Sequence, residues 1–132
     1  MNDLIKAAKA LSDETRLRMI NLLLQRECCV CEVMQVLKIS QTRASRNLNL
    51  LRDAGFLNLR KEGLWSYYSI VKRSSKGPTA SFIDAVAQGL KDDPSAHQDI
   101  SNLKKAKRLG SVSCSKGSSD RARSKMIQGE GP

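Results

Sequence analysis

The sequence predicts a mainly α-helical domain that carries one small β-hairpin. Apolar residues recur at spacings of three and four along much of the first half of the chain, which is typical of helices with one buried face. Two short runs rich in aliphatic and aromatic residues follow, and a glycine-containing turn separates them. Large apolar residues almost disappear near the C-terminus, so the packed domain is expected to end before the chain does.

Three amphipathic helices are expected in the early part of the chain. The first covers residues 2–10 and has one apolar stripe. The second covers about residues 13–25, with Ser12 as its N-cap and Asp13 near the positive end of its dipole. The third is shorter, at about residues 30–37, and Val33, Val36 and Leu37 are expected to face inward.

A short turn leads into a fourth helix, for which Ser40 is a suitable N-cap. This helix is expected to end near Gly55, because glycine readily adopts the left-handed conformation that often follows a helix. Ala44, Leu48 and Leu51 share one face at spacings of four and three, and polar side chains occupy the opposite face. The pattern therefore indicates a helix that docks on a core and presents a polar surface outward.

The hairpin is expected to consist of strands at about residues 56–60 and 65–70, with Gly63 in the turn between them. A polar connector, residues 72–79, then leads to another helix at about residues 81–90.

The C-terminal part is expected to contain a last helix and a tail. Ser81 is the expected cap of the preceding helix, and Pro94 is expected to break or restart it, with helix continuing to about Leu109. Residues 110–132 are rich in Ser, Gly, Lys and Arg and are expected to form a disordered basic tail. The expected folded domain is therefore residues 1–109.

The chain of 132 residues carries 23 Lys and Arg against 13 Asp and Glu, a formal charge of +10. That balance favours an anionic partner, either a nucleic acid or a membrane surface. No apolar run approaches the roughly 20 residues needed to span a bilayer, and no signal-peptide core is present, so a cytoplasmic protein with no membrane partner is expected. Aromatic residues are few, which favours duplex DNA over a stacked single strand.

Two helices joined by the three-residue turn 38–40 form a helix-turn-helix, and its second helix would lie in the major groove of DNA. The basic end of the hairpin would then lie on adjacent phosphates as a wing. The candidate DNA contacts are Ser40, Gln41, Thr42, Arg43, Ser45, Arg46 and Asn49 on the helix, and Arg60 and Lys61 on the hairpin. The alternative is a solvated helix face with no partner; the turn, polar helix, hairpin and positive charge together disfavour it.

The run SQTRASRNLNLLRDAGFLNLRKEGLWSYYSI, which begins at Ser40, strongly resembles the recognition helix and wing of the ArsR/SmtB winged helix-turn-helix regulators. The earlier run LSDETRLRMINLLL, which begins at Leu11, is similar to the same family's pattern. The resemblance covers about residues 3–72. It implies a transcriptional repressor that acts as a homodimer, built mainly from the first and last helices, on palindromic double-stranded operator DNA.

Three of the four cysteines lie within the run ECCVCE, residues 27–32. Cytosolic thiols stay reduced, so these cysteines are interpreted as metal-binding, reactive or buried rather than as disulfides. Three soft thiolates suit a trigonal pyramidal trivalent arsenic or antimony centre, which makes Cys28, Cys29 and Cys31 the candidate ligands. The alternative is that they pack as small buried hydrophobes, although three in four positions are dense for packing alone.

Arsenic-responsive members of the family carry a CVCDLC-like motif. Cys29 and Cys31 match its first two cysteines, whereas Met34 replaces the third. We therefore expect Cys28 to substitute as third ligand, because it lies three residues before Cys31 and on the same helical face. Cys29 would point elsewhere in a regular helix, so binding is expected to distort the helix start and thereby weaken DNA binding.

The metals that other members of the family sense fit the residues of this chain less well. The family's cadmium and lead sensors add N-terminal cysteines, but residues 1–27 contain no Cys or His, and Cys114 is expected to be a bystander. Zinc-sensing members use a D-x-H pair and a later His. Asp84 and His97 match two of those positions, but Val86 occupies the intermediate one, so His97 is expected on the surface.

The leading hypothesis is a transcriptional repressor released by arsenite or antimonite. The alternatives are a thiol redox or persulfide sensor on the same fold, or a cadmium- or lead-responsive member of the same family. An enzyme such as a thiol-based arsenate reductase is disfavoured, because the cysteines have no anion-cradling loop and no C-x5-R arrangement. A metal-buffering protein would need more than four cysteines in 132 residues.

Overall fold

The computed structural model describes residues 1–71 and 78–108, which contain six helices and three strands. In chain order these are α1 (Asn2–Ala10), α2 (Glu14–Gln25), β1 (Cys28–Cys29), α3 (Val30–Leu37), α4 (Gln41–Asp53), β2 (Leu57–Glu62), β3 (Trp65–Ile70), α5 (Pro78–Leu90) and α6 (Pro94–Lys105). The expected mainly α-helical fold with a small hairpin is confirmed. The expected tail, Cys114 and most of the polar connector lie outside the described residues.

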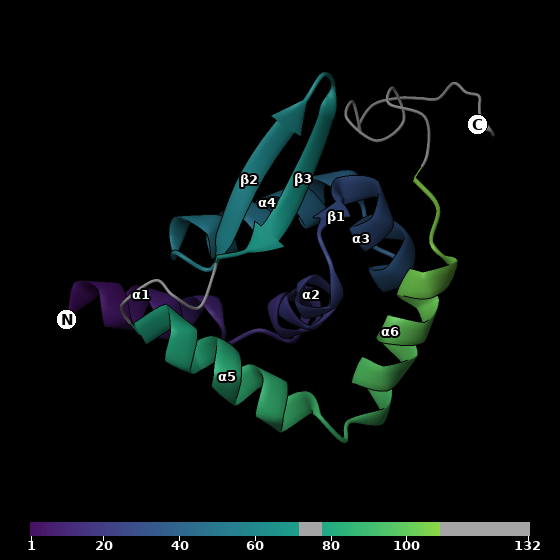
Figure 1. The fold of residues 1–132 in the computed structure, drawn as a ribbon. Coiled ribbons are helices and arrows are strands. Elements are labelled where there is room, and N and C mark those ends of the chain that lie inside the picture. Colours follow the sequence, from purple (N-terminus) through teal and green to yellow (C-terminus); the bar gives the residue numbers. More distant parts are fainter. Residues whose placement is uncertain (72–77, 109–132) are drawn as a thin grey trace.

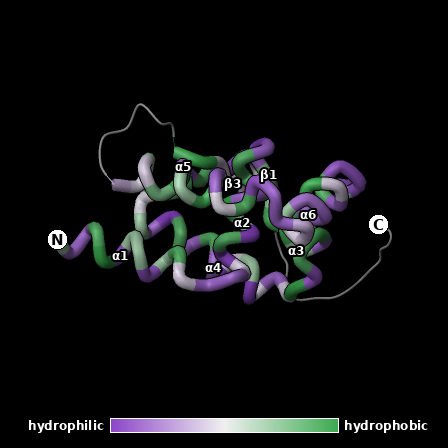
Figure 2. Tube along the Cα trace, turned by 90° about the horizontal axis from the view of Figure 1, so that it is seen from below, coloured by the Kyte–Doolittle hydropathy of each residue, from purple (hydrophilic) through white to green (hydrophobic). Residues whose placement is uncertain are grey.

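Helix α2 lies at the centre of the molecule, with α5 and α6 on one side and the hairpin on the other (Figure 1). Its side chains Met19, Ile20 and Leu22 are fully buried. Hydrophilic and hydrophobic segments alternate along the helices in Figure 2, as expected for helices that each bury one face. The core thus forms around α2, and α4 packs on it through the predicted face.

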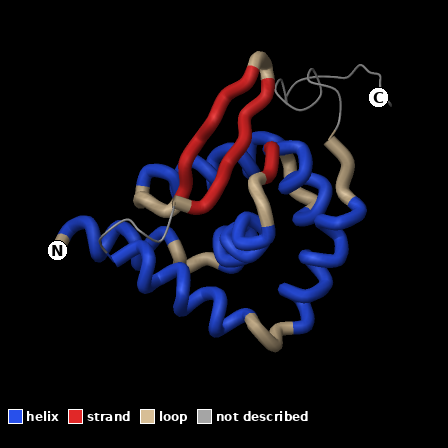
Figure 3. Tube along the Cα trace, in the orientation of Figure 1, coloured by secondary structure: helices blue, strands red, loops and turns tan. Residues whose placement is uncertain are grey.

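The strands form one antiparallel sheet in the order β1-β3-β2, on one side of the helical body (Figure 3). The predicted hairpin of β2 and β3 is confirmed, and Gly63 in its turn has φ +63°, a conformation that favours glycine. Strand β1 was not predicted. It pairs Cys28 with Tyr68 and Cys29 with Tyr67, so the thiol segment is part of the same sheet as the wing.

The N-terminal caps of α2 and α4 were predicted with different success. Asp13, and not Ser12, caps α2: its carboxylate accepts a hydrogen bond of 3.1 Å from the Arg16 backbone N–H. The Ser12 hydroxyl instead donates to the Lys9 carbonyl at 2.9 Å. Ser40 caps α4 as predicted, accepting from the Arg43 N–H at 3.1 Å.

The C-terminal helices differ in their bounds from the prediction. Helix α5 already begins at Pro78, because proline suits the first turn of a helix, so the expected cap at Ser81 was wrong. Helix α6 begins at Pro94 with Asp93 as its cap, and it ends at Lys105, earlier than expected. None of the helices within the described ranges is long and apolar enough to cross a membrane.

Candidate thiol site and nucleic-acid interface

Helix α4 presents its polar side outward. Thr42, Arg43, Arg46 and Asn49 are exposed, and Gln41 and Ser45 are half-buried at the start of the helix. The Gln41 amide donates to the Ser45 hydroxyl at 3.1 Å, which holds these two side chains together. Exposed polar groups on a docked helix are the arrangement that groove binding needs.

Arg16 of α2 fixes the position of α4. Its guanidinium donates to the Asn47 side-chain oxygen at 2.8 Å and to the Ala10 carbonyl at 2.6 Å. The buried Asn47 in turn donates to the Arg43 carbonyl at 3.0 Å. Reasoning from the sequence missed this link between α1, α2 and α4, although Arg16 stands in the run LSDETRLRMINLLL that carries the family resemblance.

Asn49 and Arg60, both candidate DNA contacts, already have partners within the protein. The Tyr68 hydroxyl of β3 donates to the Asn49 side-chain oxygen at 2.8 Å, which ties α4 to the wing. Arg60 pairs with Glu27 at 2.9 Å and with Glu62 at 3.0 Å. Hydrogen bonds and charge from Glu27, then Glu62, raise the pKa of Arg60, so a phosphate would have to compete with two carboxylates.

The three clustered thiols are divided between two sides of a strand. Cys28 and Cys29 form β1, and successive side chains of a strand point to opposite faces. Cys28 packs in the main core around α2, whereas Cys29 packs with Cys31, Tyr67 and Trp65 in a separate cluster. The expectation that Cys28 and Cys31 share a helical face, with Cys29 pointing elsewhere, is therefore wrong, because the helix begins only at Val30.

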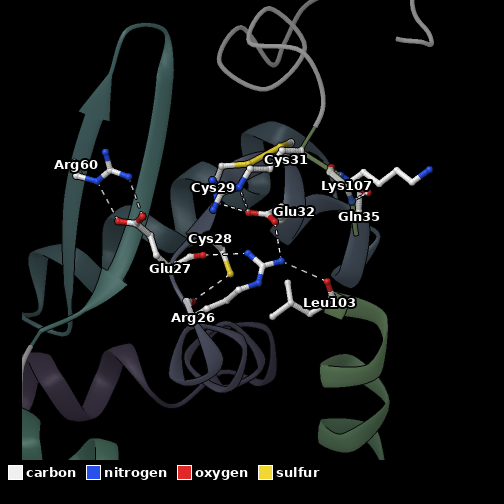
Figure 4. Close-up of polar contacts among 11 residues, drawn as sticks. Arg26, Glu27, Cys28, Cys29, Cys31, Glu32, Gln35, Arg60, Leu103 and Lys107 are labelled. Atoms are coloured by element: carbon white, nitrogen blue, oxygen red, sulfur yellow. Dashed lines mark hydrogen bonds and ion pairs between the residues drawn. A yellow bond between two sulfur atoms is a disulfide. The ribbon is translucent and has the colours of Figure 1, made fainter. Parts of the chain in front are cut away.

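Cys29 and Cys31 are joined by a disulfide, with their Cα atoms 5.5 Å apart (Figure 4). The expectation that disulfides are absent is wrong for this pair. Both residues are almost completely buried. The Cys28 thiol lies 3.5 Å from the Arg26 carbonyl, and burial, with the nearby charge of Glu32, raises its pKa to about 12.

Glu32 is a buried carboxylate beside the thiols. Its side chain accepts from the Cys29 backbone N–H at 2.9 Å and pairs with Arg26 at 2.7 Å and Arg108 at 3.3 Å. Burial alone would raise the pKa of Glu32, but the hydrogen bonds from Arg26 and Cys29 and the charges of both arginines lower it overall. Glu32 stands three residues after Cys29, the spacing of a capping box, and this signal could have identified it.

The segment after α6 lies against the thiol segment. The Gln35 amide donates to the Lys107 carbonyl at 2.5 Å, and the Lys107 N–H donates back at 3.1 Å (Figure 4). Arg26 reaches the Leu103 carbonyl at 3.4 Å. Arg108 lies over the Tyr67 ring, 4.8 Å from its centroid. No sequence pattern predicted these contacts, since they join residues far apart in the chain; Gln35 and Lys107, for example, are 72 positions apart.

The other side chains that could bind a metal ion do not form a cluster in the described residues. Within residues 1–71 and 78–108, no three His, Cys, Asp or Glu side chains are grouped closely enough to hold a metal ion. His97 is exposed, as predicted, and its ring nitrogen contacts the Lys91 carbonyl. A three-thiolate centre would therefore require the thiol segment to rearrange.

Helices α3 and α4 with the turn between them, followed by the hairpin, define a winged helix-turn-helix protein. Solved structures of similar fold include the following two. HlyU from Vibrio cholerae is 27% identical, with a TM-score of 0.59 over 69% of this chain and 95% of that one. The homodimeric winged helix-turn-helix DNA-binding domain Mb0332 from Mycobacterium bovis is also 27% identical, with a TM-score of 0.59 over 70% and 82%.

Residues 13–58 match the model of the bacterial regulatory protein, arsR family. An uncharacterized HTH-type transcriptional regulator of Methanocaldococcus jannaschii is 44% identical over 64 residues, 48% of this chain and 72% of that protein. This chain belongs to the ArsR family, which confirms the resemblance found in its sequence.

Two further relatives are named for arsenic. An arsenic resistance transcriptional regulator of Pseudomonas putida is 39% identical over 64% of this chain, and the arsenical resistance operon repressor of Escherichia coli is 45% identical over 50% of it. The chain spans 62% of the length of the first and 57% of the second.

Proposed function

We propose that this chain is a dimeric transcriptional repressor that releases its operator when trivalent arsenic or antimony binds to Cys28, Cys29 and Cys31. One observation carries this proposal: the thiol segment is at once a strand paired with the wing and the start of the helix that precedes α4. A ligand that reshapes this segment acts on both DNA-binding elements. The arsenic-related names of two relatives support the choice of inducer.

The proposed DNA-binding surface consists of α4 and the wing. Arg43 and Arg46 are exposed on α4, and Thr42 lies between the helix start and these cations. Lys61 is exposed near the hairpin tip. These groups would contact bases and phosphates, while Arg16 and Asn47 hold α4 in place from behind.

The dimer would form through the N-terminal helix. Leu4 and Ile5 of α1 are 48% and 44% exposed, although both are large apolar residues, and α5 lies beside α1 (Figure 1). A second copy would cover these side chains and bring a second α4 to the other half of a palindromic site. The similar domain from Mycobacterium bovis is described as homodimeric.

The release mechanism follows from the position of Cys28. Its thiol faces the core, on the opposite side of β1 from Cys29, so it can reach the same ion only if β1 separates from β3. Binding also removes the proton that the raised pKa of Cys28 retains. Separation of β1 from Tyr67 and Tyr68 would shift the wing and the Tyr68–Asn49 contact to α4.

A redox response is the second candidate function, and the Cys29–Cys31 disulfide is the observation that favours it. Oxidation of the pair would then change operator affinity with no metal present. A cadmium or lead response is a third candidate, since a relative from Staphylococcus aureus, 44% identical over 69 residues, is named as a cadmium resistance regulatory protein homolog.

A gel-shift titration of the reduced protein on its own upstream promoter tests these candidates, with arsenite, antimonite, cadmium and zinc as ligands and with an oxidant in a separate metal-free series. Single Cys28→Ser, Cys29→Ser and Cys31→Ser variants are expected to bind DNA but to respond poorly to arsenite. Cys114→Ser is expected to respond like the wild type. Release by cadmium alone, or by an oxidant alone, would replace arsenic with the corresponding alternative.

A further inference from the structure

The end of α6 and the residues after it carry a dense run of cations. Residues 104–108 read KKAKR, which gives four cations in five positions, and residues 100–108 contain no acidic residue. Lys104, Lys105 and Lys107 are exposed, and none of their side chains forms an ion pair with another described residue. These charges lie outside the surface formed by α4 and the wing and are available to a further anionic partner.

Hydrogen bonds to α3 hold this basic segment, residues 104–108, in place. The Gln35 amide donates to the Lys107 carbonyl at 2.5 Å, and the Gln35 side-chain oxygen accepts from the Lys107 N–H at 3.1 Å (Figure 4). Arg108 pairs with the buried Glu32 of α3 at 3.3 Å. Because these hydrogen bonds use the backbone of Lys107, its ammonium group stays available.

The neighbours of the basic segment place it near the DNA backbone. In a helix-turn-helix the first helix crosses the sugar–phosphate backbone while the second lies in the major groove. Helix α3 is that first helix here. At the end of the segment, Arg108 lies over the ring of Tyr67 in the wing strand β3, 4.8 Å from its centroid. The segment therefore lies beside the two elements that would contact phosphates outside the groove.

The proposed dimer would put the basic segment at the outer side of each half-site. The exposed apolar side chains of α1, Leu4 and Ile5, are the proposed subunit contact. Helices α1 and α6 lie on opposite sides of the molecule in both Figure 1 and Figure 2. In a twofold-symmetric complex α1 would lie near the dyad, so the basic segment would lie toward the outer end of the operator.

We propose that the basic segment is a third DNA-binding element, which contacts phosphates that flank the half-site occupied by α4 and the wing. Its partner is the DNA backbone, because lysines bind phosphate as point charges on flexible stems and such contacts carry no sequence information. The inference rests on the proposed function and extends the surface by which the repressor holds its operator. Gln35 is then a positioning residue, since it fixes the segment through the Lys107 backbone.

The test compares the full wild-type chain with a triple variant that combines Lys104→Gln, Lys105→Gln and Lys107→Gln. Binding to a long fragment of the upstream promoter is measured by fluorescence anisotropy at several salt concentrations without metal. Each neutralised phosphate contributes about 0.9 to the slope of the logarithm of the binding constant against the logarithm of the salt concentration. The triple variant is expected to reduce that slope by about two to three and to weaken binding about tenfold or more at physiological salt.

Hydroxyl-radical footprinting locates the contacts on the DNA. The wild type is expected to protect backbone positions outside the half-sites, and the triple variant is expected to lose only these outermost protections. Lys91→Gln is the matched control for the single variant Lys105→Gln, since Lys91 is also exposed but lies directly after α5. Lys105→Gln should reduce the salt slope by about one, whereas Lys91→Gln should leave the slope and the footprint unchanged.

Gln35→Ala tests the placement of the segment separately from its charge. All four cations remain, but two hydrogen bonds to the Lys107 backbone are lost, so operator affinity is expected to fall about threefold. Gln98→Ala is the matched control, because the exposed Gln98 side chain bonds to Asn102 within α6 at 3.0 Å. Thermal melts verify that each variant is folded.

Each outcome decides one claim. The inference is wrong if the triple variant keeps the wild-type salt slope and footprint, or if it weakens the whole footprint evenly and retains the outermost protections. Wild-type affinity of Gln35→Ala would overturn the placement of the segment by α3. Arsenite added to the wild-type complexes tests the proposed function: if the operator stays bound while the triple variant behaves as expected, the proposed function fails and the inference stands.

Discussion

At the scale of single residues, Glu32 shows how a charge can be buried beside thiols. Its carboxylate accepts a hydrogen bond from the backbone N–H at the start of α3 and balances Arg26, six residues before it, and Arg108, from the segment after α6. The side chain is only 3% exposed, but its partners Arg26 and Arg108 are 39% and 44% exposed. Solvent therefore screens part of the attraction, and the contribution to stability is moderate.

Glu32→Gln is expected to lower the free energy of unfolding by about 1–2 kcal/mol, because the amide keeps the size of the side chain but leaves two arginines without their counter-charge. Chemical denaturation at neutral pH measures the change. Glu62→Gln is the matched control, since Glu62 is 71% exposed and its loss should be scarcely measurable. Equal effects of the two substitutions would show that burial of Glu32 is unimportant.

The difference between the wild type and Glu32→Gln is expected to depend on pH. The folded state lowers the pKa of Glu32 below its ordinary value of 4.5, so the stabilisation is present above that value and is lost as the pH falls through the lowered pKa. Denaturation curves at a series of acidic pH values should therefore converge. A difference that stays constant down to pH 2 would contradict this assignment.

At the scale of elements, the sequence was informative where one local signal dominates. The polar face of α4, its cap at Ser40 and the hairpin glycine were all predicted. Strand β1 was missed because two residues are too few for a period-2 pattern, and the pairing with β3 that defines it is not local. The error at β1 led to the wrong face for Cys28. The role of the three thiols as ligands stays a prediction.

Arg16 and Arg46 of α2 and α4 are expected to contribute to DNA binding in different ways. Arg46→Ala should weaken operator binding and leave folding unchanged. It should also reduce by about one the slope of the logarithm of the DNA-binding constant against the logarithm of the salt concentration, because one cation that would contact a phosphate is removed. Arg16→Lys should lower stability and operator affinity but leave the salt slope unchanged, since lysine cannot reproduce the fork to Asn47 and Ala10. Gel shifts at several salt concentrations and thermal melts distinguish the two.

The contact between Tyr68 and Asn49 is expected to couple the thiol segment to α4. Tyr68→Phe removes one hydrogen bond and should lower the free energy of unfolding by about 0.5–1.5 kcal/mol. Arsenite should still bind. The ratio of the operator affinity without arsenite to that with arsenite should decrease, because β3 no longer has a hydrogen bond from Tyr68 to α4. An unchanged ratio would exclude the contact as a carrier of the coupling.

At the scale of the whole molecule, α6 and the segment that follows it are bonded to α2 and α3. Arg18 of α2 holds the buried Asp99 with two hydrogen bonds of 2.8 Å, and the segment after α6 is bonded to α3 through Gln35. Helices α2, α3 and α6 are therefore held together by side-chain contacts within the described residues. The large apolar side chains that remain exposed on α1 are then available for another subunit.

Leu4→Asp is expected to convert a dimer to a monomer while leaving the helix content unchanged, because the side chain is already 48% exposed in the single chain and only a second copy would bury it. Sedimentation gives the oligomeric state, and circular dichroism gives the helix content. Leu64→Asp is the matched control, since Leu64 is 57% exposed but lies in the hairpin turn, far from α1 along the chain. If the monomeric variant also loses operator affinity, two copies of α4 are needed to hold the site. A variant that remains dimeric would place the subunit interface elsewhere on the molecule.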